Sequence, residues 1–259
     1  MSKPVFPNLI IAGFPKCGTH ALLHNLGHHP DIHAHPHELG FFEKPDASRS
    51  AYQSHFRSDC LWNVEKSPLY AVNPDAMRRM ASLVPAARVI LCIRHPIQAV
   101  HSFYHFRVFE FLNGFRSGVD PARYSFETWV LEEPPVRHFS IQYFRYMDHM
   151  LEHVLPCFPP DQIHVVIQER MMADMAAGMG RVFQWLGLSS LPDAFEVKLK
   201  FHGEQYRYPH IDYHTPGYRA AVDKLWDLYE RPNQALRSRL GDPLPEWDVF
   251  DRMYARGAT

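Results

Sequence analysis

Long apolar runs are missing from this 259-residue sequence. No stretch approaches the ~18 consecutive apolar residues that a membrane-spanning helix needs. Residues 5–14 are mostly apolar, but Pro7 interrupts them and no signal-peptide cleavage pattern follows. We therefore expect a soluble, cytoplasmic protein without a membrane span.

Cysteine is scarce and neither sign of charge is in excess. Cys17, Cys60, Cys92 and Cys157 lie far apart without a C-x-x-C pair, which favours reduced thiols over a disulfide framework. The 27 Lys and Arg residues against 28 Asp and Glu residues give a net charge of −1. A general nucleic-acid binder would be strongly basic, so no nucleic-acid partner is expected.

Low-complexity segments and linkers are also missing, so residues 1–259 are expected to form one domain with a full-sized core. Short apolar runs alternate with helical patterns, which predicts the α/β class. Besides the two segments discussed below, we expect helices over residues 74–82, 136–153 and 173–186 and a strand over residues 162–168.

Histidine, by contrast, is abundant, with 18 residues and a cluster between positions 28 and 37. His33, His35 and His37 would share one face of a strand, and neutral imidazole is a common zinc ligand. However, Pro30 and Pro36 interrupt regular pairing, and no cysteine joins the cluster. We expect a substrate-facing or solvent-exposed polar loop and no metal site.

The segment around which the chain is organised is residues 8–26, NLIIAGFPKCGTHALLHNL. Four apolar residues from Leu9 predict a buried parallel strand that ends at Gly13. Phe14 to Gly18 then form a turn, and a helix begins at Thr19 or His20. Unpaired N–H groups at a helix start bind anionic oxygens. This segment therefore predicts a phosphate-binding loop.

The loop departs from the nucleoside-triphosphate P-loop. The spacing from Gly13 to Gly18 fits G-x-x-x-x-G-K-[ST], but Thr19 occupies the position of the required lysine. The one lysine, Lys16, lies inside the loop. A kinase-like loop and an ordinary strand-turn-helix remain alternatives at this point.

A second informative segment is residues 88–107, RVILCIRHPIQAVHSFYHFR. It predicts a buried strand that ends before Arg94 and a helix that begins at Pro96, with Ser102 about two turns along. A nucleotide kinase would have an aspartate at such a strand end to hold magnesium. Arginine instead offers a fork of donors for an anion such as phosphate.

Together these motifs resemble those of sulfotransferases that use 3′-phosphoadenosine 5′-phosphosulfate (PAPS). The string PKCGTH is similar to their 5′-phosphosulfate loop, P-K-[ST]-G-[TS]-[TS], with Cys17 and His20 departing from the usual hydroxyl residues. Arg94 and Ser102 match the 3′-phosphate pattern R-x-x-x-x-x-x-x-S. The family resemblance implies a P-loop-like fold, a central parallel sheet flanked by helices.

Two further segments resemble the glycosaminoglycan or carbohydrate branch of that family. HPHELGFFEK is similar to K-E-x-x-F-F, with His37 in place of the lysine, and EKSPLY matches E-K-[ST]-P-x-Y. Without the resemblance, the sequence favours a solvated strand end for Glu65 and Lys66. Phe41 and Phe42 are expected to shield Glu38 from water.

The resemblance implies a role for each matching residue. Lys16, Glu38 and Lys66 would be catalytic, with Glu38 as the base, and the neighbouring histidines are its rivals for that role. The cofactor PAPS, which leaves as 3′-phosphoadenosine 5′-phosphate (PAP), would be bound by Lys16, Cys17, Gly18, Thr19, His20, Arg94, Ser102 and Arg207. Arg207 is the remaining basic residue of a segment, residues 201–209, that only partly matches the family's K-G-R-x-x-P loop.

The predicted function is sulfuryl transfer from PAPS to a hydroxyl or amine of a saccharide, lipid or small natural product. The first alternative is a nucleotide kinase or NTPase-like enzyme, disfavoured by the misplaced lysine and the missing aspartate. The second is a non-catalytic PAP-binding module that has lost the chemistry.

Overall fold

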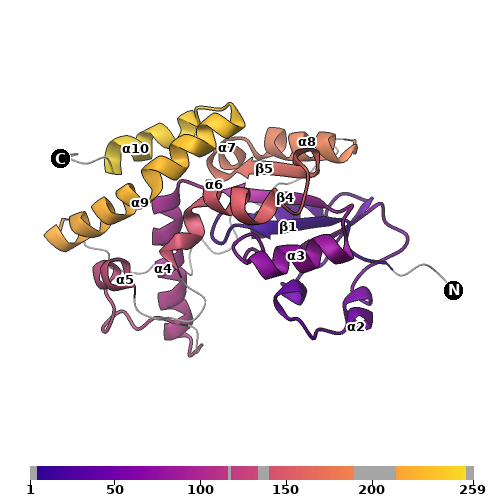
Figure 1. The fold of residues 1–259 in the computed structure, drawn as a ribbon, viewed down its shortest axis with the longest axis horizontal. Coiled ribbons are helices and arrows are strands. Elements are labelled where there is room, and N and C mark those ends of the chain that lie inside the picture. Colours follow the sequence, from indigo (N-terminus) through magenta and orange to yellow (C-terminus); the bar gives the residue numbers. More distant parts are fainter. Residues whose placement is uncertain (1–4, 116–117, 134–139, 190–213, 255–259) are drawn as a thin grey trace. The chain divides into compact units, whose positions relative to one another are not determined.

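A computed structural model describes residues 5–115, 118–133, 140–189 and 214–254 of the chain (Figure 1). Its contacts divide the chain into two compact units. Unit 1 is Met1–Ile93 with His149–Phe201, and unit 2 is Arg94–Asp148 with His202–Thr259. That the whole chain forms one domain stays a prediction.

Unit 1 contains a five-stranded parallel sheet in the order β2-β3-β1-β4-β5. Its strands are β1 Leu9–Gly13, β2 Ile32–Ala34, β3 Trp62–Lys66, β4 Arg88–Ile93 and β5 Ile163–Ile167. All five residues of β1 are buried, as is typical of a central parallel strand covered on both faces. The α/β class and the parallel sheet are thereby confirmed.

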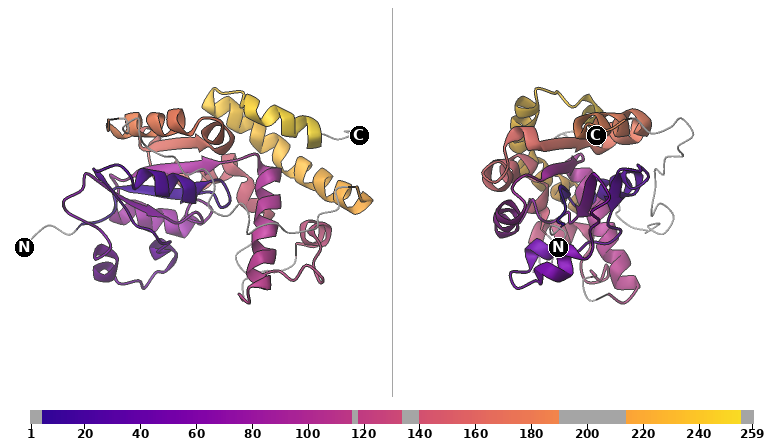
Figure 2. Two further views of the ribbon diagram at one scale, coloured as in Figure 1. Left: turned by 180° about the vertical axis from the view of Figure 1, so that it is seen from behind. Right: turned by 90° about the vertical axis from the view of Figure 1, so that its right-hand side faces the viewer.

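Helices cover both faces of this sheet. Because the connection through α1 leads from β1 in one direction along the sheet and the connection through α3 leads from β3 in the other, right-handed crossovers place these helices on opposite faces. Figures 1 and 2 show this arrangement. The helical segments of unit 1 are α1 Thr19–Leu26, η1 Phe41–Glu43, α2 Arg49–Gln53, α3 Pro74–Leu83, η3 Met150–Val154, η4 Pro160–Gln162, α7 Gln168–Ala173 and α8 Met175–Leu186.

Local sequence signals explain several helix ends. The Asn73 side chain accepts bonds from the N–H groups of Asp75 and Ala76, and Pro74 occupies the first position of α3. Helix α8 ends at Gly187, which has the left-handed conformation that L side chains disfavour (φ 75°). Both helices were predicted from these signals.

All regular secondary-structure elements among the described residues of unit 2 are helical. Its segments are α4 Pro96–Leu112, α5 Phe126–Glu132, η2 Ile141–Phe144, α6 Tyr146–His149, which extends by one residue into unit 1, α9 Pro216–Leu240, η5 Pro245–Trp247 and α10 Asp248–Tyr254. Helix α9 packs against α4, α5 and α10. The fully buried Trp129, Tyr229 and Trp247 are among its core residues.

The predicted helix over residues 136–153 is wrong as a single element. Over its described part, the chain instead forms a 3₁₀ turn, one turn of α-helix and a π-helical segment. The buried Tyr229 hydroxyl donates to the Ile141 carbonyl (2.6 Å), a tertiary contact that the apolar periodicity does not report. Of the helices in the described ranges, none combines the length and apolar composition needed to cross a bilayer.

Candidate active site

The loop after β1 has the predicted order of strand, turn and helix. Lys16 and Gly18 both have left-handed backbones (φ 61° and 83°), and α1 begins directly after Gly18. A Cβ on Gly18 would lie 3.2 Å from Cγ of Gln168, so this position needs glycine for both conformation and space. The turn therefore leads directly into the N–H groups of the first turn of α1.

The side chains of this loop differ in exposure. Cys17 and Thr19 are buried, Lys16 is half-buried and His20 is exposed. The Cys17 thiol donates to the carbonyl of Pro15 at 3.4 Å. The thiol is thus directed into the loop itself. Cysteine, which stands where the family usually has a hydroxyl residue, makes its hydrogen bond within the protein.

The end of β3 lies beside the strand that leads into this loop. Lys66 is paired in register with Ile11, and the N–H groups of Ser67 and Ala71 donate to the carbonyls of Ile11 (3.1 Å) and Ala12 (2.9 Å). A Cβ on Gly13 would lie 2.9 Å from the Cβ of Ala71. Glycine at position 13 thus permits close approach between the end of β1 and the turn after β3.

Lys66 and Glu38 form an ion pair in unit 1. The side chain of Lys66 is 5% exposed and that of Glu38 is 55% exposed. A buried ammonium requires a partner, and the half-exposed carboxylate supplies it while keeping one side open to solvent. The structure therefore brings together two of the three predicted catalytic residues.

The expected shielding of Glu38 by two phenylalanines is wrong. Phe41 stacks on the Tyr52 ring (centroids 3.9 Å apart, 8° between planes), and Phe42 is buried against the rings of Tyr52 and Tyr70. These rings anchor the segment to the core instead of covering Glu38. Their ring partners, Tyr52 and Tyr70, come from other segments of the chain. The F-F pattern alone therefore could not show that the two phenylalanine rings face the core and not Glu38.

The alternative that Glu65 and Lys66 form a solvated strand end is also wrong. Glu65 is 0% exposed, and the hydroxyls of Tyr52, Ser67 (3.1 Å) and Tyr70 (2.6 Å) all donate to its carboxylate. Burial raises the pKa of the Glu65 carboxyl above its usual range, although the three hydroxyl bonds act in the opposite direction. No role was assigned to Glu65 from the sequence. The signal that could have revealed one is the presence of a carboxylate in a strand that is buried on both faces.

The histidines near Glu38 have different surroundings. Burial lowers the pKa of His35, and its ring contacts that of His55 (4.6 Å between centroids). His35 Nδ1 and the carbonyl of His37 are 2.9 Å apart, and the His37 side chain is exposed. Among the residues that the structure describes, no group of three or more His, Cys, Asp or Glu side chains is arranged to hold a metal ion.

The predicted 3′-phosphate residues belong to unit 2. Arg94 directly follows the last residue of β4, Pro96 opens α4, and Ser102 lies within that helix, as the sequence predicted. The Arg94 guanidinium donates to Oε1 of Gln98 at 3.5 Å, and the Gln98 amide donates to the hydroxyl of Tyr254 in α10. Gln98 and Tyr254 therefore orient Arg94 within this unit.

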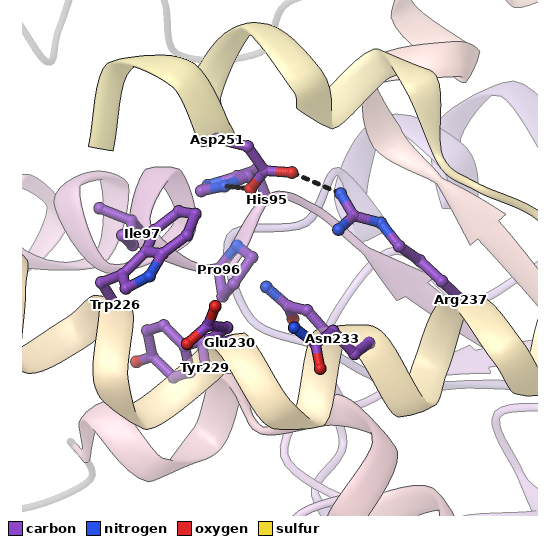
Figure 3. A pocket seen from close by; sticks show the side chains of 10 residues that line it. His95, Pro96, Ile97, Trp226, Tyr229, Glu230, Asn233, Arg237 and Asp251 are labelled. Carbon is purple, nitrogen blue, oxygen red and sulfur yellow. Dashed lines mark hydrogen bonds and ion pairs between the residues drawn. The ribbon is translucent and has the colours of Figure 1, made fainter. Parts of the chain in front are cut away.

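A second connection to α10 starts at His95, which precedes α4. The Asp251 carboxylate accepts from Arg237 (2.5 Å) and lies 3.3 Å from Nε2 of the buried His95 (Figure 3). Burial acts to raise the pKa of Asp251, but its bonds with His95 and Arg237 outweigh burial and lower it. The adjoining cavity has a volume of about 70 Å³, which is well below the ~300 Å³ of typical ligand pockets. We therefore regard this network as a brace for the β4–α4 turn.

The predicted contribution of Arg207 is not tested, because that residue lies outside the described ranges. The same holds for the rest of residues 201–209. Of the predicted site residues, the Lys16 loop and the Glu38–Lys66 pair thus belong to unit 1, and Arg94 and Ser102 belong to unit 2.

Comparison with known proteins identifies the class. A family model described as the sulfotransferase family matches residues 41–193, which is more than half of the chain. The chain therefore belongs to the sulfotransferase family, and the resemblance seen in its motifs is confirmed. Lys66, Arg94 and Ser102 fall within the matched range.

Individual relatives are heparan sulfate sulfotransferases. The chain is 31% identical over 200 residues to the human heparan sulfate glucosamine 3-O-sulfotransferase 6, covering 71% of this chain and 53% of that protein. It is 25% identical over 217 residues to the Caenorhabditis briggsae bifunctional heparan sulfate N-deacetylase/N-sulfotransferase 1, covering 77% and 24%. The chain thus spans about half the length, or less, of these relatives.

Solved structures of sulfotransferases share the fold. The structure of a sulfotransferase from Alicyclobacillus acidocaldarius matches with a TM-score of 0.70 and 19% identity, covering 94% of this chain and 99% of that one. The mouse sulfotransferase SULT7A1, solved in complex with PAP, matches with a TM-score of 0.56 and 16% identity, covering 88% of each chain. At these identities the likeness concerns the fold, which is the P-loop-like sulfotransferase fold.

Proposed function

We propose that this protein transfers a sulfuryl group from PAPS to a hydroxyl or amine of a saccharide acceptor. The observation that carries the proposal is the Glu38–Lys66 pair at the end of β3, the strand beside the one that leads into the Lys16 loop. An anion-binding turn and a solvent-facing carboxylate are the two groups that such a transfer requires. The saccharide acceptor is inferred from the relatives, which are named as heparan sulfate sulfotransferases.

The residues present fit a bound adenosine phosphosulfate. The turn from Lys16 to Thr19 offers a cation and helix N–H groups to the 5′-phosphosulfate, and Arg94 with Ser102 offers donors to the 3′-phosphate. PAPS supplies an activated sulfuryl group with PAP as the leaving group. Arg207 stays a predicted contributor.

The chemistry resembles phosphoryl transfer, in which positioning and charge neutralisation contribute most of the catalysis. As the acceptor oxygen forms its bond to sulfur, its proton passes to Glu38. With PAPS bound in the turn, Lys16 and the N–H groups of Gly18 and Thr19 would stabilise the negative charge on the leaving 5′-phosphate oxygen. Lys66 orients Glu38 through their ion pair.

Two rival functions lead to different binding results. A nucleotide kinase should be stabilised by ATP with magnesium, whereas a sulfotransferase and a non-catalytic module should both be stabilised by PAP. A thermal-shift measurement with PAP, and separately with ATP and Mg²⁺, distinguishes the kinase. Transfer of label from ³⁵S-PAPS to a panel of saccharides then separates the enzyme from the module.

The same panel decides the acceptor class. We expect label on a saccharide hydroxyl or amine, and include lipid and small natural-product acceptors as comparison arms. Stabilisation by ATP with Mg²⁺ but not by PAP would contradict the proposed function. The cytoplasmic location stays a prediction from the sequence.

A further inference from the structure

The buried Glu65 carboxylate is the centre of a hydrogen-bond network that the mechanism above does not use. Three hydroxyls donate to it, from Tyr52, Ser67 and Tyr70. Glu65 belongs to β3, Tyr52 to α2, and Ser67 and Tyr70 to the turn after β3. A fully buried carboxylate is costly without such partners, so this cluster is a built feature.

Two of the three hydroxyls also accept hydrogen bonds from the Glu38-bearing segment, residues 38–43. The N–H of Gly40 donates to Oγ of Ser67 at 3.1 Å, and the N–H of Phe42 donates to the Tyr70 hydroxyl at 3.2 Å. Each of these hydroxyls donates its single O–H hydrogen bond to Glu65 and accepts a hydrogen bond from a backbone N–H of the segment. The network is therefore directional, from the backbone N–H groups through the hydroxyls to the carboxylate.

The third hydroxyl has a different relation to the segment. Tyr52 donates to Glu65, but its hydroxyl accepts no backbone bond from residues 38–43 among the described contacts. Its ring stacks on Phe41. Tyr52 and Tyr70 therefore both donate a phenolic hydrogen bond to Glu65. Of the two, Tyr70 also accepts a backbone hydrogen bond from residues 38–43.

We propose that Glu65 is a positioning residue that fixes the backbone carrying Glu38, acting through Ser67 and Tyr70. Gly40 has a left-handed backbone (φ 56°) two residues after Glu38, and both Gly40 and Phe42 are tied to the network. Lys66, adjacent to Glu65 in β3, holds the Glu38 carboxylate itself. One strand end thus sets both the backbone and the side chain of the proposed base.

This inference rests on the proposed function for its catalytic meaning, but its structural content can be tested without activity. The first readout is hydrogen–deuterium exchange at the amides of Gly40 and Phe42. Tyr70→Phe should speed exchange at Phe42, and Ser67→Ala at Gly40, each by about 10-fold, because each removes one buried acceptor. Tyr52→Phe is the matched control and should change either rate by less than about 2-fold.

The second readout is turnover with an acceptor that the wild-type protein sulfates. Tyr70→Phe should lower kcat by about 10-fold with the KM for PAPS unchanged, since misplacing the base affects the chemical step. Tyr52→Phe should lower kcat clearly less. A general loss of structure would affect both variants and the KM together.

The outcomes are distinguishable. Equal exchange rates and equal kcat losses in Tyr70→Phe and Tyr52→Phe would overturn the inference. If Tyr70→Phe fails to fold, Ser67→Ala gives the same test at Gly40, and unchanged exchange there would overturn it. A wild-type protein that shows the expected exchange pattern but transfers no sulfuryl group contradicts the proposed function and leaves the network's hold on residues 38–43 intact.

Discussion

Lys16 has a left-handed backbone in the turn that precedes α1. For a residue with a Cβ this conformation costs roughly 1–2 kcal/mol, and such local strain tends to occur at functional turns. This conformation puts the Lys16 cation in the turn that leads into α1. The half-buried Lys16 is therefore our principal candidate for stabilising the leaving oxygen.

Replacement of this lysine tests that role. Lys16→Ala should lower kcat by about 10²–10³, comparable to the loss of one preorganised donor at a developing oxyanion. PAP affinity, measured by calorimetry, should fall less than kcat. A variant that retains the wild-type kcat would exclude Lys16 from the chemical step.

Glu38 and its neighbouring histidines compete for the role of base. Glu38→Gln keeps the shape of the side chain but cannot accept a proton, so kcat should fall by about 10²–10⁴ with PAP affinity intact. His35→Gln and His37→Gln should cost clearly less, because His35 is buried with its Nδ1 close to the His37 carbonyl. Steady-state kinetics of the three variants decides the assignment, and a reversed order of effects would show that Glu38 is not the base.

At the scale of elements, the sequence was most informative where the signals are local. Strand β1, its glycine turn and α1 were predictable because the conformation of Gly18 and the apolar run are encoded within 19 residues. The cap of α3 and the Arg94-Pro96 helix start were predictable for the same reason.

Long-range contacts were not predictable from one sequence. The network around Glu65 joins residues 52, 65, 67 and 70 to the backbone of residues 40 and 42. The alternation of residues along β3 does not indicate that the Tyr52 hydroxyl donates to Glu65. The brace between α10 and His95 spans 156 residues. These parts of the site depend on tertiary packing, which local propensity does not report.

Helix α10 provides the prediction at this scale. Asp251→Asn removes the charge that pairs with Arg237 and lies next to His95, and should destabilise the protein by about 1–3 kcal/mol. That corresponds to a fall in Tm of about 2–10 °C for a chain of this size. The control is Asp248→Asn in the exposed first turn of the same helix, and equal Tm losses in the two variants would contradict the brace.

At the scale of the whole molecule, the residues proposed to bind PAPS are found in both compact units. Lys16, Glu38 and Lys66 belong to unit 1, and Arg94 and Ser102 to unit 2. The chain passes from one unit to the other at Ile93, the end of β4.

A buried histidine makes unit 2 sensitive to acid. Burial lowers the pKa of His101 to about 3, and its ring stacks on Phe126 and lies 3.2 Å from the Tyr218 hydroxyl. Because the folded pKa lies below the unfolded value of about 6.5, His101 favours the folded state fully above pH ~6.5 and loses that contribution as pH falls toward 3. His101→Phe should therefore lose less Tm than the wild type between pH 7 and pH 4.

Thermal melts across this pH range measure the effect. His28→Gln, at an exposed position, serves as the control and should follow the wild-type profile. Parallel profiles for His101→Phe and the wild type would show that protonation of His101 does not limit stability in acid.

The measurement that tests PAPS use most directly is calorimetric titration of PAP and of adenosine 5′-monophosphate into the wild-type protein and the Arg94→Ala variant. The wild type should prefer PAP, and Arg94→Ala should lose at least about 10-fold of that preference, because charge-assisted bonds to phosphate contribute about 1.5–3 kcal/mol each. Binding of adenosine 5′-monophosphate should change little. Equal weakening of both ligands, or a wild-type protein with no preference for the 3′-phosphate, would contradict the account.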